Sequence, residues 1–226
     1  MSNQEQATTQ VAAPDTADDH DRILAPSRLL LVRHGESTWN AAHRIQGQLD
    51  PPLTDRGSAQ ANEVGERLVG HRLAAFYCSD LVRTRQTAEL IASAVGMEPV
   101  PDPGLREIAL GAWEGKTREE LMEEYPELWE RWAREPDWDL VPDGEGAAPF
   151  TARVNATLNR IRSDHPGGDV LCVTHGGVIQ VALLGVVGGV SRGIFPFLIE
   201  NCSLTVIQRT SRRTVVTAVN DTCHLT

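Results

Sequence analysis

The sequence predicts an α/β domain with a largely parallel sheet, and two features of the chain lead to this prediction. Short apolar runs of strand length alternate with longer, helix-like segments, which is typical of α/β layers. Residues 29–32 are Leu-Leu-Leu-Val, a continuous apolar run of the kind found in strands buried on both faces. The chain has 226 residues, 41% of them hydrophobic and 23% charged, which fits one globular domain with a sizeable core.

The expected elements follow in order after an N-terminal tail. Residues 1–26 are polar, acidic and almost free of large apolar side chains. They cannot bury enough surface to offset the entropy lost on ordering, so we expect a disordered tail. The folded domain is expected over 27–226. Strands are expected at 28–33, 74–78, 169–174, 203–208 and 214–219, and helices near 55–70, 81–95, 117–134, 150–164 and 177–187.

Charge and composition exclude several classes of partner. The formal net charge of −10 argues against a nucleic-acid binder, although a local arginine cluster can still attract a small anion. The longest apolar stretch, 178–190, contains Gln180 and is shorter than the about 17 residues of a short membrane span, so no membrane partner is expected. No signal peptide is visible, and four cysteines without a CxxC pair are interpreted as free thiols in a reducing cytoplasm.

Two predicted strands end in a His-Gly pair. Arg33, His34 and Gly35 follow the first apolar run, and His175 and Gly176 follow the run at 169–174. Because ligands of open α/β sheets bind at the carboxyl ends of the strands, we expect both histidines at one site. A lone histidine is more often a satisfied core residue, but two such strand ends favour a functional role. The glycines would allow a ligand to approach the main chain closely.

An arginine and a carboxylate extend the predicted site. Ser79 or Asp80 is expected to cap the helix after the second strand, which places Arg83 in its first turn. A cation there opposes the helix dipole, so its presence calls for an anion, whereas Arg85 is expected at the surface. Glu107 lies in an irregular, glycine-rich segment and is weak as a signal on its own.

Together these residue types favour phosphoryl transfer through a histidine nucleophile. Arg33 and Arg83 can hold phosphate oxygens, and a neutral imidazole can attack phosphorus and divide one displacement into two. Glu107 could protonate the leaving oxygen and later accept a proton from the attacking water. Glu36 could be considered as a metal ligand beside His34, but the adjacent arginine and the absence of an HExxH spacing argue against a metal site.

In this order, four segments resemble the signatures of the histidine phosphatase superfamily, also called phosphoglycerate mutase-like. They are RHGES with Trp39 and Asn40, then SDLVRTRQTA, LREIALGAWEG and THGG, and the resemblance covers nearly the whole chain after the tail. It implies a three-layer α/β/α sandwich that needs neither metal nor cofactor. It also implies five catalytic residues: His34 as the phosphorylated nucleophile, Arg33, Arg83 and His175 around the phosphate, and Glu107 as proton donor. Five substrate-binding residues are implied as well: Asn40, Gln46, Gly47, Gly176 and Asn201.

The branch of this family is predicted from two further segments. Mutases carry an arginine pair after the acid segment, and none occurs in 113–138, which favours the phosphatase branch. The segment PDGEGAAPFTARV resembles that branch's Gly-Glu-Ser helix entry, with Gly146 in place of serine and therefore a weaker cap.

The expected function is metal-independent hydrolysis of phosphomonoesters of small metabolites through a phosphohistidine. The partner is a small phosphorylated metabolite, with the natural substrate unnamed and a homodimer left open. A mutase on the same site is one alternative. A catalytically silent binding protein on the same scaffold is another, and the retention of all five expected catalytic residues disfavours it.

Overall fold

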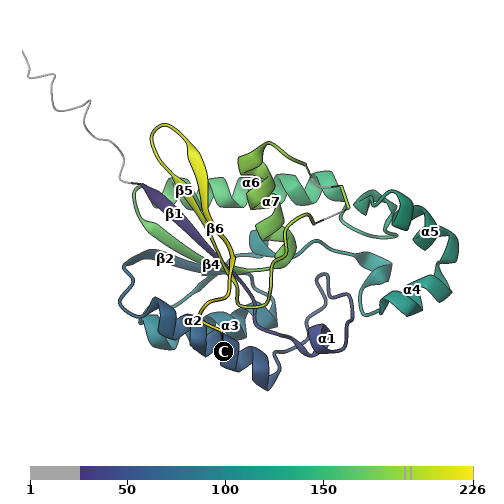
Figure 1. Cartoon of the computed structure of the whole chain (residues 1–226), viewed down its shortest axis with the longest axis horizontal. Coiled ribbons are helices and arrows are strands. Elements are labelled where there is room, and N and C mark those ends of the chain that lie inside the picture. Colours follow the sequence, from purple (N-terminus) through teal and green to yellow (C-terminus); the bar gives the residue numbers. More distant parts are fainter. Residues whose placement is uncertain (1–25, 191, 194, 226) are drawn as a thin grey trace, which may run out of the picture.

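The computed structural model describes residues 26–190, 192–193 and 195–225. The tail expected over 1–26 therefore lies, except for Pro26, outside the described residues. The centre of the domain is a six-stranded sheet with the order β3-β2-β4-β1-β5-β6 (Figure 1). Its strands are β1 Ser27–Arg33, β2 Leu73–Cys78, β3 Val100–Pro101, β4 Asp169–Thr174, β5 Leu204–Arg209 and β6 Thr214–Asp221.

The sheet is parallel on one side and antiparallel on the other. Strand β1 runs parallel to β4, and β2 runs parallel to both β4 and β3. Strand β5 pairs antiparallel with β1, and the β5–β6 hairpin closes that edge. The predicted α/β class with a mostly parallel sheet is confirmed. The antiparallel strands follow the helix after β4, so the carboxyl ends of β1, β2 and β4 stay free to build a site.

Helices cover both faces of the sheet, which gives the expected three layers (Figure 1). Helices α2 Asp55–Leu68 and α3 Val82–Val95 lie on one face, and α6 Ala147–Asp164 and α7 Gly176–Val187 lie on the other. The first strand shows why both faces must be covered. Leu30 and Val32 pack in the apolar cluster of α2 and α3, whereas Leu31 packs in the cluster of α6 and α7, as side chains alternate along a strand.

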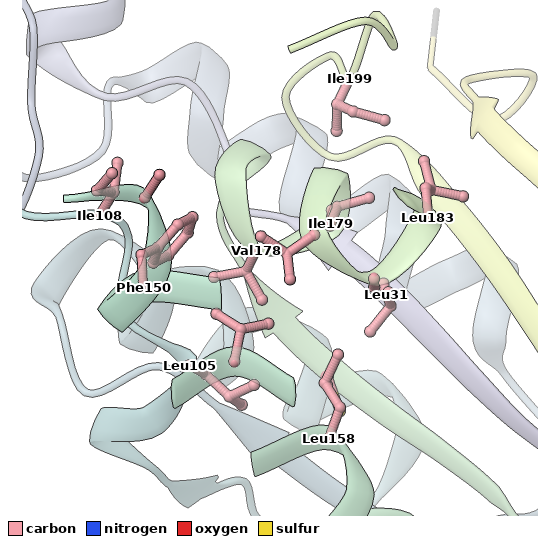
Figure 2. Close-up of a cluster of buried hydrophobic side chains, with 14 of the residues drawn as sticks. Leu31, Leu105, Ile108, Phe150, Leu158, Val178, Ile179, Leu183 and Ile199 are labelled. Atoms are coloured by element: carbon pink, nitrogen blue, oxygen red, sulfur yellow. The ribbon is translucent and has the colours of Figure 1, made fainter. Parts of the chain in front are cut away.

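Figure 2 shows the second of these clusters. Leu31 lies there among side chains of α6 and α7 such as Leu158 and Ile179, all of them buried. Burial of apolar surface on both faces stabilises the sheet by about 25 cal/mol per Å², and it also fixes the register that brings β1 and β4 side by side.

Some expected elements differ from the structure. The helix expected over 117–134 is two helices, α4 Arg118–Glu124 and α5 Pro126–Arg134. The break occurs at Tyr125 because a proline disfavours helical geometry in the residue before it and lacks the N–H that would continue the helix. Five short elements had no sequence prediction: the two-residue β3, the four-residue α1 Thr38–Ala41, and the 3₁₀ turns Pro103–Leu105, Gly111–Trp113 and Trp138–Leu140.

Helix α6 begins three residues earlier than expected, at Ala147. The N-cap residue before it provides no side-chain hydrogen bond to the helix. This residue is Gly146 with φ 79°, a left-handed conformation that suits glycine. The carboxylate of Asp139 accepts from the Ala147 N–H at 2.9 Å and thereby takes the place of the missing cap.

Two further findings concern the cysteines and the membrane. All four cysteines are free thiols; Cys78, Cys172 and Cys202 are buried, and Cys223 is exposed. Of the helices that the structure describes, none combines the length and the hydropathy needed to cross a bilayer.

Candidate active site

The two histidines meet because strands β1 and β4 are neighbours in register. Arg33 pairs with Thr174 at the ends of these strands, and the His34 N–H donates to the Thr174 carbonyl at 2.9 Å. The imidazoles of His34 and His175 lie edge to face, with centroids 5.3 Å apart. Both residues are almost completely buried, with 3% and 0% of their surfaces exposed. The predicted meeting of two strand ends is therefore what the fold produces.

The hydrogen bonds of His34 define its tautomer. Its Nδ1 lies 2.8 Å from the carbonyl oxygen of Gly35. A carbonyl only accepts, so Nδ1 carries the proton and Nε2 keeps a lone pair. Burial, and then the charges of Arg83 and Arg33, hold the pKa of this imidazole well below its usual range. The ring is therefore neutral near pH 7, which is the form that can act as a nucleophile.

His175 has both ring nitrogens engaged. Arg83 Nη2 lies 3.2 Å from Nδ1, and Ser79 Oγ lies 2.9 Å from Nε2. Because a guanidinium only donates, Nδ1 is the acceptor and Nε2–H donates to Ser79. Burial, followed by the charge of Arg83, also holds the pKa of His175 well below its usual range. His175 is thus a neutral ring that connects β4 to β2 and α3.

This use of Ser79 corrects one prediction. Neither Ser79 nor Asp80 caps α3; the N-cap position is Leu81, which has no side-chain cap. The Ser79 hydroxyl is turned to His175 instead. The Ser79 hydroxyl also accepts from the N–H of Leu81 at 3.4 Å, one residue before the helix begins. Asp80 accepts two hydrogen bonds from Arg106, from Nε at 2.7 Å and from Nη2 at 2.6 Å.

Arg83 lies in the first turn of α3, as predicted, and only 1% of its surface is exposed. It donates to the carbonyls of Gly47 at 2.8 Å and Leu49 at 2.7 Å. Burial lowers its pKa to about 10, opposed by the nearby charges of Glu107 and Asp50. The guanidinium remains charged at pH 7. Arg85, two residues further along the helix, pairs with Glu89 on the surface, as expected.

Arg33, which is half-buried, supplies the second guanidinium. Its Nη1 donates to the carbonyl of Ile199 at 2.6 Å, and burial lowers its pKa. The Nε atoms of both Arg33 and Arg83 are buried without a hydrogen-bond partner among the described residues. Buried donors are nearly always satisfied in folded proteins, so two such donors beside a neutral imidazole are suited to an anion.

The two candidate acids have different surroundings. Glu107 accepts from the N–H of Gly177 and of Ile108, both at 3.0 Å, and so lies at the start of α7 next to His175. Glu114 accepts from the N–H of Gln48 and of Leu110, both at 2.8 Å. Glu114 therefore braces the loop at residues 46–48, whereas Glu107 is the carboxylate near the histidines.

The predicted substrate-binding residues are linked to this centre. Asn201 donates from Nδ2 to the His34 carbonyl at 2.9 Å and to Asn40 Oδ1 at 3.2 Å. Asn40 closes a capping box with Ser37 at α1, and the Ser37 hydroxyl also donates to Gln46 Oε1 at 2.8 Å. Asn201, Asn40, Ser37 and Gln46 therefore form one row of hydrogen-bonded side chains that begins at the His34 carbonyl.

The two predicted glycines lie against the arginines. Gly47 has φ 51° and presents its carbonyl to Arg83. A Cβ atom at Gly176 would lie 3.8 Å from Arg33 Nε. The fold thus brings all ten predicted residues to one edge of the sheet. Residues outside that set also contact the site. The Ser79 hydroxyl bonds to His175, and the Gly177 N–H donates to Glu107. Arg153 donates to the Glu107 carbonyl at 3.2 Å, and Glu145 accepts from the Ala109 N–H at 3.2 Å.

Carboxylates near the site do not form a metal-ligand cluster. Within the ranges that the structure describes, no three His, Cys, Asp or Glu side chains are grouped so that they could hold a metal ion. Glu36, considered above as a ligand, accepts from Thr54 Oγ1 at 2.9 Å and pairs with Arg56 at 3.2 Å.

Comparison with known proteins identifies the family. The chain belongs to the histidine phosphatase superfamily (branch 1), whose sequence model matches residues 29–222. It is 37% identical over 198 residues to phosphoserine phosphatase 1 of Hydrogenobacter thermophilus, covering 88% of this chain and 94% of that one. It is 34% identical over 206 residues to a probable phosphoglycerate mutase of Yersinia pestis, with the same coverage of 88% and 94%.

A solved structure gives the same result. A phosphoserine phosphatase mutant from Entamoeba histolytica, crystallised with phosphoserine, superposes with a TM-score of 0.75 and 29% identity. The match covers 88% of this chain and all of that one (100%). The resemblance predicted from the four sequence segments is confirmed, and the phosphatase names among the relatives support a phosphomonoesterase.

Proposed function

We propose that this phosphatase hydrolyses small phosphomonoesters through a phosphohistidine formed on His34. One observation carries the proposal: a neutral imidazole, whose Nε2 lone pair meets no hydrogen-bond donor among the described residues, lies close to the guanidinium groups of Arg33 and Arg83, each with a buried, unpartnered Nε. A lone pair on a neutral ring is a nucleophile, and the paired cations suit a phosphoryl group as its target.

The first half of the reaction forms the intermediate. Nε2 of His34 attacks phosphorus, and the bond between phosphorus and the leaving oxygen breaks. Charge on the phosphoryl oxygens is stabilised by Arg33 and Arg83, which are already in place and need no reorganisation. Glu107 gives its proton to the leaving oxygen, which departs as an alcohol.

The second half releases phosphate. A water molecule attacks phosphorus, Glu107 takes a proton from it, and the bond between Nε2 and phosphorus breaks. His175 contributes by holding Arg83 through Nδ1, with Ser79 fixing the other side of the ring. Besides the substrate and this water molecule, every group in the two steps is a side chain of the protein, and the proposed steps use no metal ion.

The proposed substrates are small phosphorylated metabolites. Among the relatives, one is named a phosphoserine phosphatase and another structure of that kind of enzyme contains 3-phosphoglyceric acid. Phosphoserine and 3-phosphoglycerate are therefore the first compounds to test. The four free thiols fit the reducing cytoplasm that we propose as the protein's location.

A mutase is the second candidate, because one relative is named a probable phosphoglycerate mutase. A mutase passes the phosphoryl group from the histidine to another hydroxyl instead of to water. The segment 113–138 lacks the arginine pair that grips the phosphoglycerate carboxylate in mutases, which favours water as the acceptor.

A substrate screen distinguishes these functions. Phosphate release is measured from a panel of phosphorylated metabolites, beside an assay for conversion of 3-phosphoglycerate to 2-phosphoglycerate, with and without a chelator. We expect phosphate release from at least one compound, unchanged by chelation and lost in His34→Ala. Isomerisation that outpaces phosphate release would replace this proposal with the mutase, and activity that depends on an added divalent ion would contradict the mechanism.

A further inference from the structure

The guanidinium of Arg153 on α6 uses all five of its N–H donors. Two of them form a bidentate pair with Glu145, from Nε at 2.8 Å and from Nη2 at 2.7 Å. The others go to main-chain carbonyls: Nη1 donates to Gly104 at 3.1 Å and to Arg106 at 2.9 Å, and Nη2 donates to Glu107 at 3.2 Å. An arginine has no further donors, so the side chain is fully committed to these groups.

Two of the three carbonyls, those of Arg106 and Glu107, belong to the segment that carries the candidate acid, and the third, that of Gly104, lies in the 3₁₀ turn just before it. Residues 106–110 form neither helix nor strand, so no regular hydrogen-bond ladder holds their backbone. Glu145 holds the other end of this segment, because its carboxylate accepts from Ala109 N–H at 3.2 Å and its own N–H donates to the Ala109 carbonyl at 2.9 Å. The Arg153–Glu145 pair therefore forms hydrogen bonds to the backbone on both sides of Glu107.

The pair itself has a rigid support. Helix α6 is anchored in the core by side chains such as Phe150, with 2% of its surface exposed, and Val154, with 0%. The Arg153 guanidinium lies 5.2 Å from the centroid of the Phe150 ring. The side chains of Arg153 and Glu145 are only 24% and 17% exposed, and a bidentate charged pair in such surroundings is among the stronger hydrogen-bonded contacts.

We propose that Arg153, held by Glu145, is the positioning residue that fixes Glu107 for proton transfer. The inference rests on the proposed role of Glu107 as the acid. None of the five hydrogen bonds of Arg153 goes to a histidine of the site, so its contacts reach the acid through the backbone that they hold, while its charge adds to the low pKa of His175. With that backbone fixed, the Glu107 carboxylate reaches the N–H of Gly177. A displacement of about 1 Å at a reacting group can reduce a rate by about 10²-fold, so this support matters.

The test uses leaving groups of different quality. Arg153→Ala, Arg153→Lys and Glu145→Gln are assayed with an alkyl phosphate, which needs a proton on its leaving oxygen, and with 4-nitrophenyl phosphate, which hardly does. We expect kcat/KM for the alkyl phosphate to fall about 10-fold to 100-fold in Arg153→Ala, several times more than for the aryl phosphate. Arg153→Lys should fall between it and the wild type, since a lysine keeps the charge but lacks the planar fork.

A matched control exists at the opposite end of β1. Arg28 and Asp169 also form a bidentate pair, with Nε to Oδ1 at 2.7 Å and a second bond from Nη2 to Oδ2. Arg28→Ala should lower the melting temperature but leave the alkyl-to-aryl activity ratio unchanged. If Arg153→Ala does not fold, Arg153→Lys and Glu145→Gln supply the ratio.

The outcomes separate this inference from the proposed function. Glu107→Gln is measured in the same assay. An unchanged ratio in all Arg153 and Glu145 variants, beside a shifted ratio in Glu107→Gln, overturns the positioning role and leaves the acid assignment standing. An unchanged ratio in Glu107→Gln as well overturns both. In the Glu107→Gln background, Arg153→Ala should add almost nothing to the loss with the alkyl phosphate, and a full additional loss contradicts the inference.

Discussion

The ends of strands β1 and β4 carry the same sequence pattern, an apolar run followed by His-Gly, yet their histidines are held differently. His34 has one ring nitrogen on the Gly35 carbonyl, and the other meets no hydrogen-bond partner within the described ranges. His175 has both nitrogens engaged, by Arg83 and Ser79. A nucleophile needs a nitrogen that is not engaged in a hydrogen bond, whereas a ring that orients a guanidinium needs two partners. The hydrogen bonds, and not the motif, distinguish the two roles.

The loop after β1, whose Gly35 carbonyl accepts from the His34 ring, is held by close approach of the main chain at two glycines. A Cβ atom at Gly35 would lie 2.4 Å from the carbonyl oxygen of Gly57, and one at Gly57 would lie 2.1 Å from the carbonyl of Glu36. The two glycines thus let the start of α2 pack directly on the loop after β1. The Gly35 N–H also donates to Thr87 Oγ1 at 3.0 Å, which ties this loop to α3. Main-chain contacts therefore set the ring of His34, while side chains set the ring of His175.

The largest expected effect separates the two histidines directly. His34→Ala should reduce kcat by at least about 10⁴-fold with every substrate, because it removes the atom that forms the intermediate. His175→Ala should cost about 10²-fold to 10³-fold, the loss typical of one group that stabilises a transition state. Steady-state rates of phosphate release measure both. Equal losses in the two variants would remove the distinction between the strand ends.

The next largest difference is expected between substitutions of Glu107 and Glu114, the two carboxylates of the acid segment. Glu107→Gln should lower kcat/KM for an alkyl phosphate by about 10²-fold to 10⁴-fold and for 4-nitrophenyl phosphate by much less, since only the alkyl leaving group needs the proton. Glu114→Gln should give a smaller, uniform loss, because Glu114 braces the N–H groups of Gln48 and Leu110. If the two variants exchange these behaviours, Glu114 is the acid.

The two glycines after His175 provide a sharper test of the acid's position. A Cβ atom at Gly177 would lie 2.1 Å from Glu107 Oε1, so Gly177→Ala must push the carboxylate aside. We expect a loss of about 10-fold to 100-fold with an alkyl phosphate and little change in stability, since a side-chain end can move. Gly176→Ala, whose Cβ would meet Arg33 at ordinary contact distances, with Nε at 3.8 Å and Cδ at 4.0 Å, should lose less than about 10-fold. Similar losses in both variants would argue against Glu107 as the displaced group.

The smallest effect concerns stability and pH. The pKa values of His34 and His175 are both lowered in the folded protein, so below the unfolded value of about 6.5 the unfolded state binds more protons. Stability is therefore fully present above pH 6.5 and is lost as pH falls, by up to about 1.4 kcal/mol per pH unit for each ring. Denaturant unfolding of His175→Asn at pH 7, 6 and 5 should show a shallower loss than the wild type. Parallel slopes would show that the ring already titrates normally.

Several parts of the fold and site could be predicted because their signals are local. The apolar run at 29–32 followed by Arg33 and His34 marks both a buried strand and its functional end. Arg83 was predicted from its unfavourable place in a first helical turn, and it is buried at the site. The break of the helix at Tyr125 also had a local signal, the following proline, which the prediction of one helix over 117–134 did not take into account.

Other parts depend on contacts between distant residues, which a local pattern does not contain. Ser79 was assigned to a helix cap, but its hydroxyl bonds to His175, 96 positions away in the sequence. Arg153 reaches the Glu107 carbonyl across 46 positions, and the sequence marks it only as an arginine on a helix. The two-residue strand β3 was also missed, because Val100 and Pro101 are too few to form a strand pattern.

The most direct test of the central claim is to trap the intermediate on His34. The protein is mixed briefly with a substrate carrying ³²P in its phosphate, quenched, and digested so that the labelled residue can be located. We predict a phosphoprotein that is labile in acid, stable in base, and labelled at His34, with no label in His34→Ala and label still present in Glu107→Gln when an aryl phosphate is used. Label on His175, on a serine or on an aspartate would contradict the account.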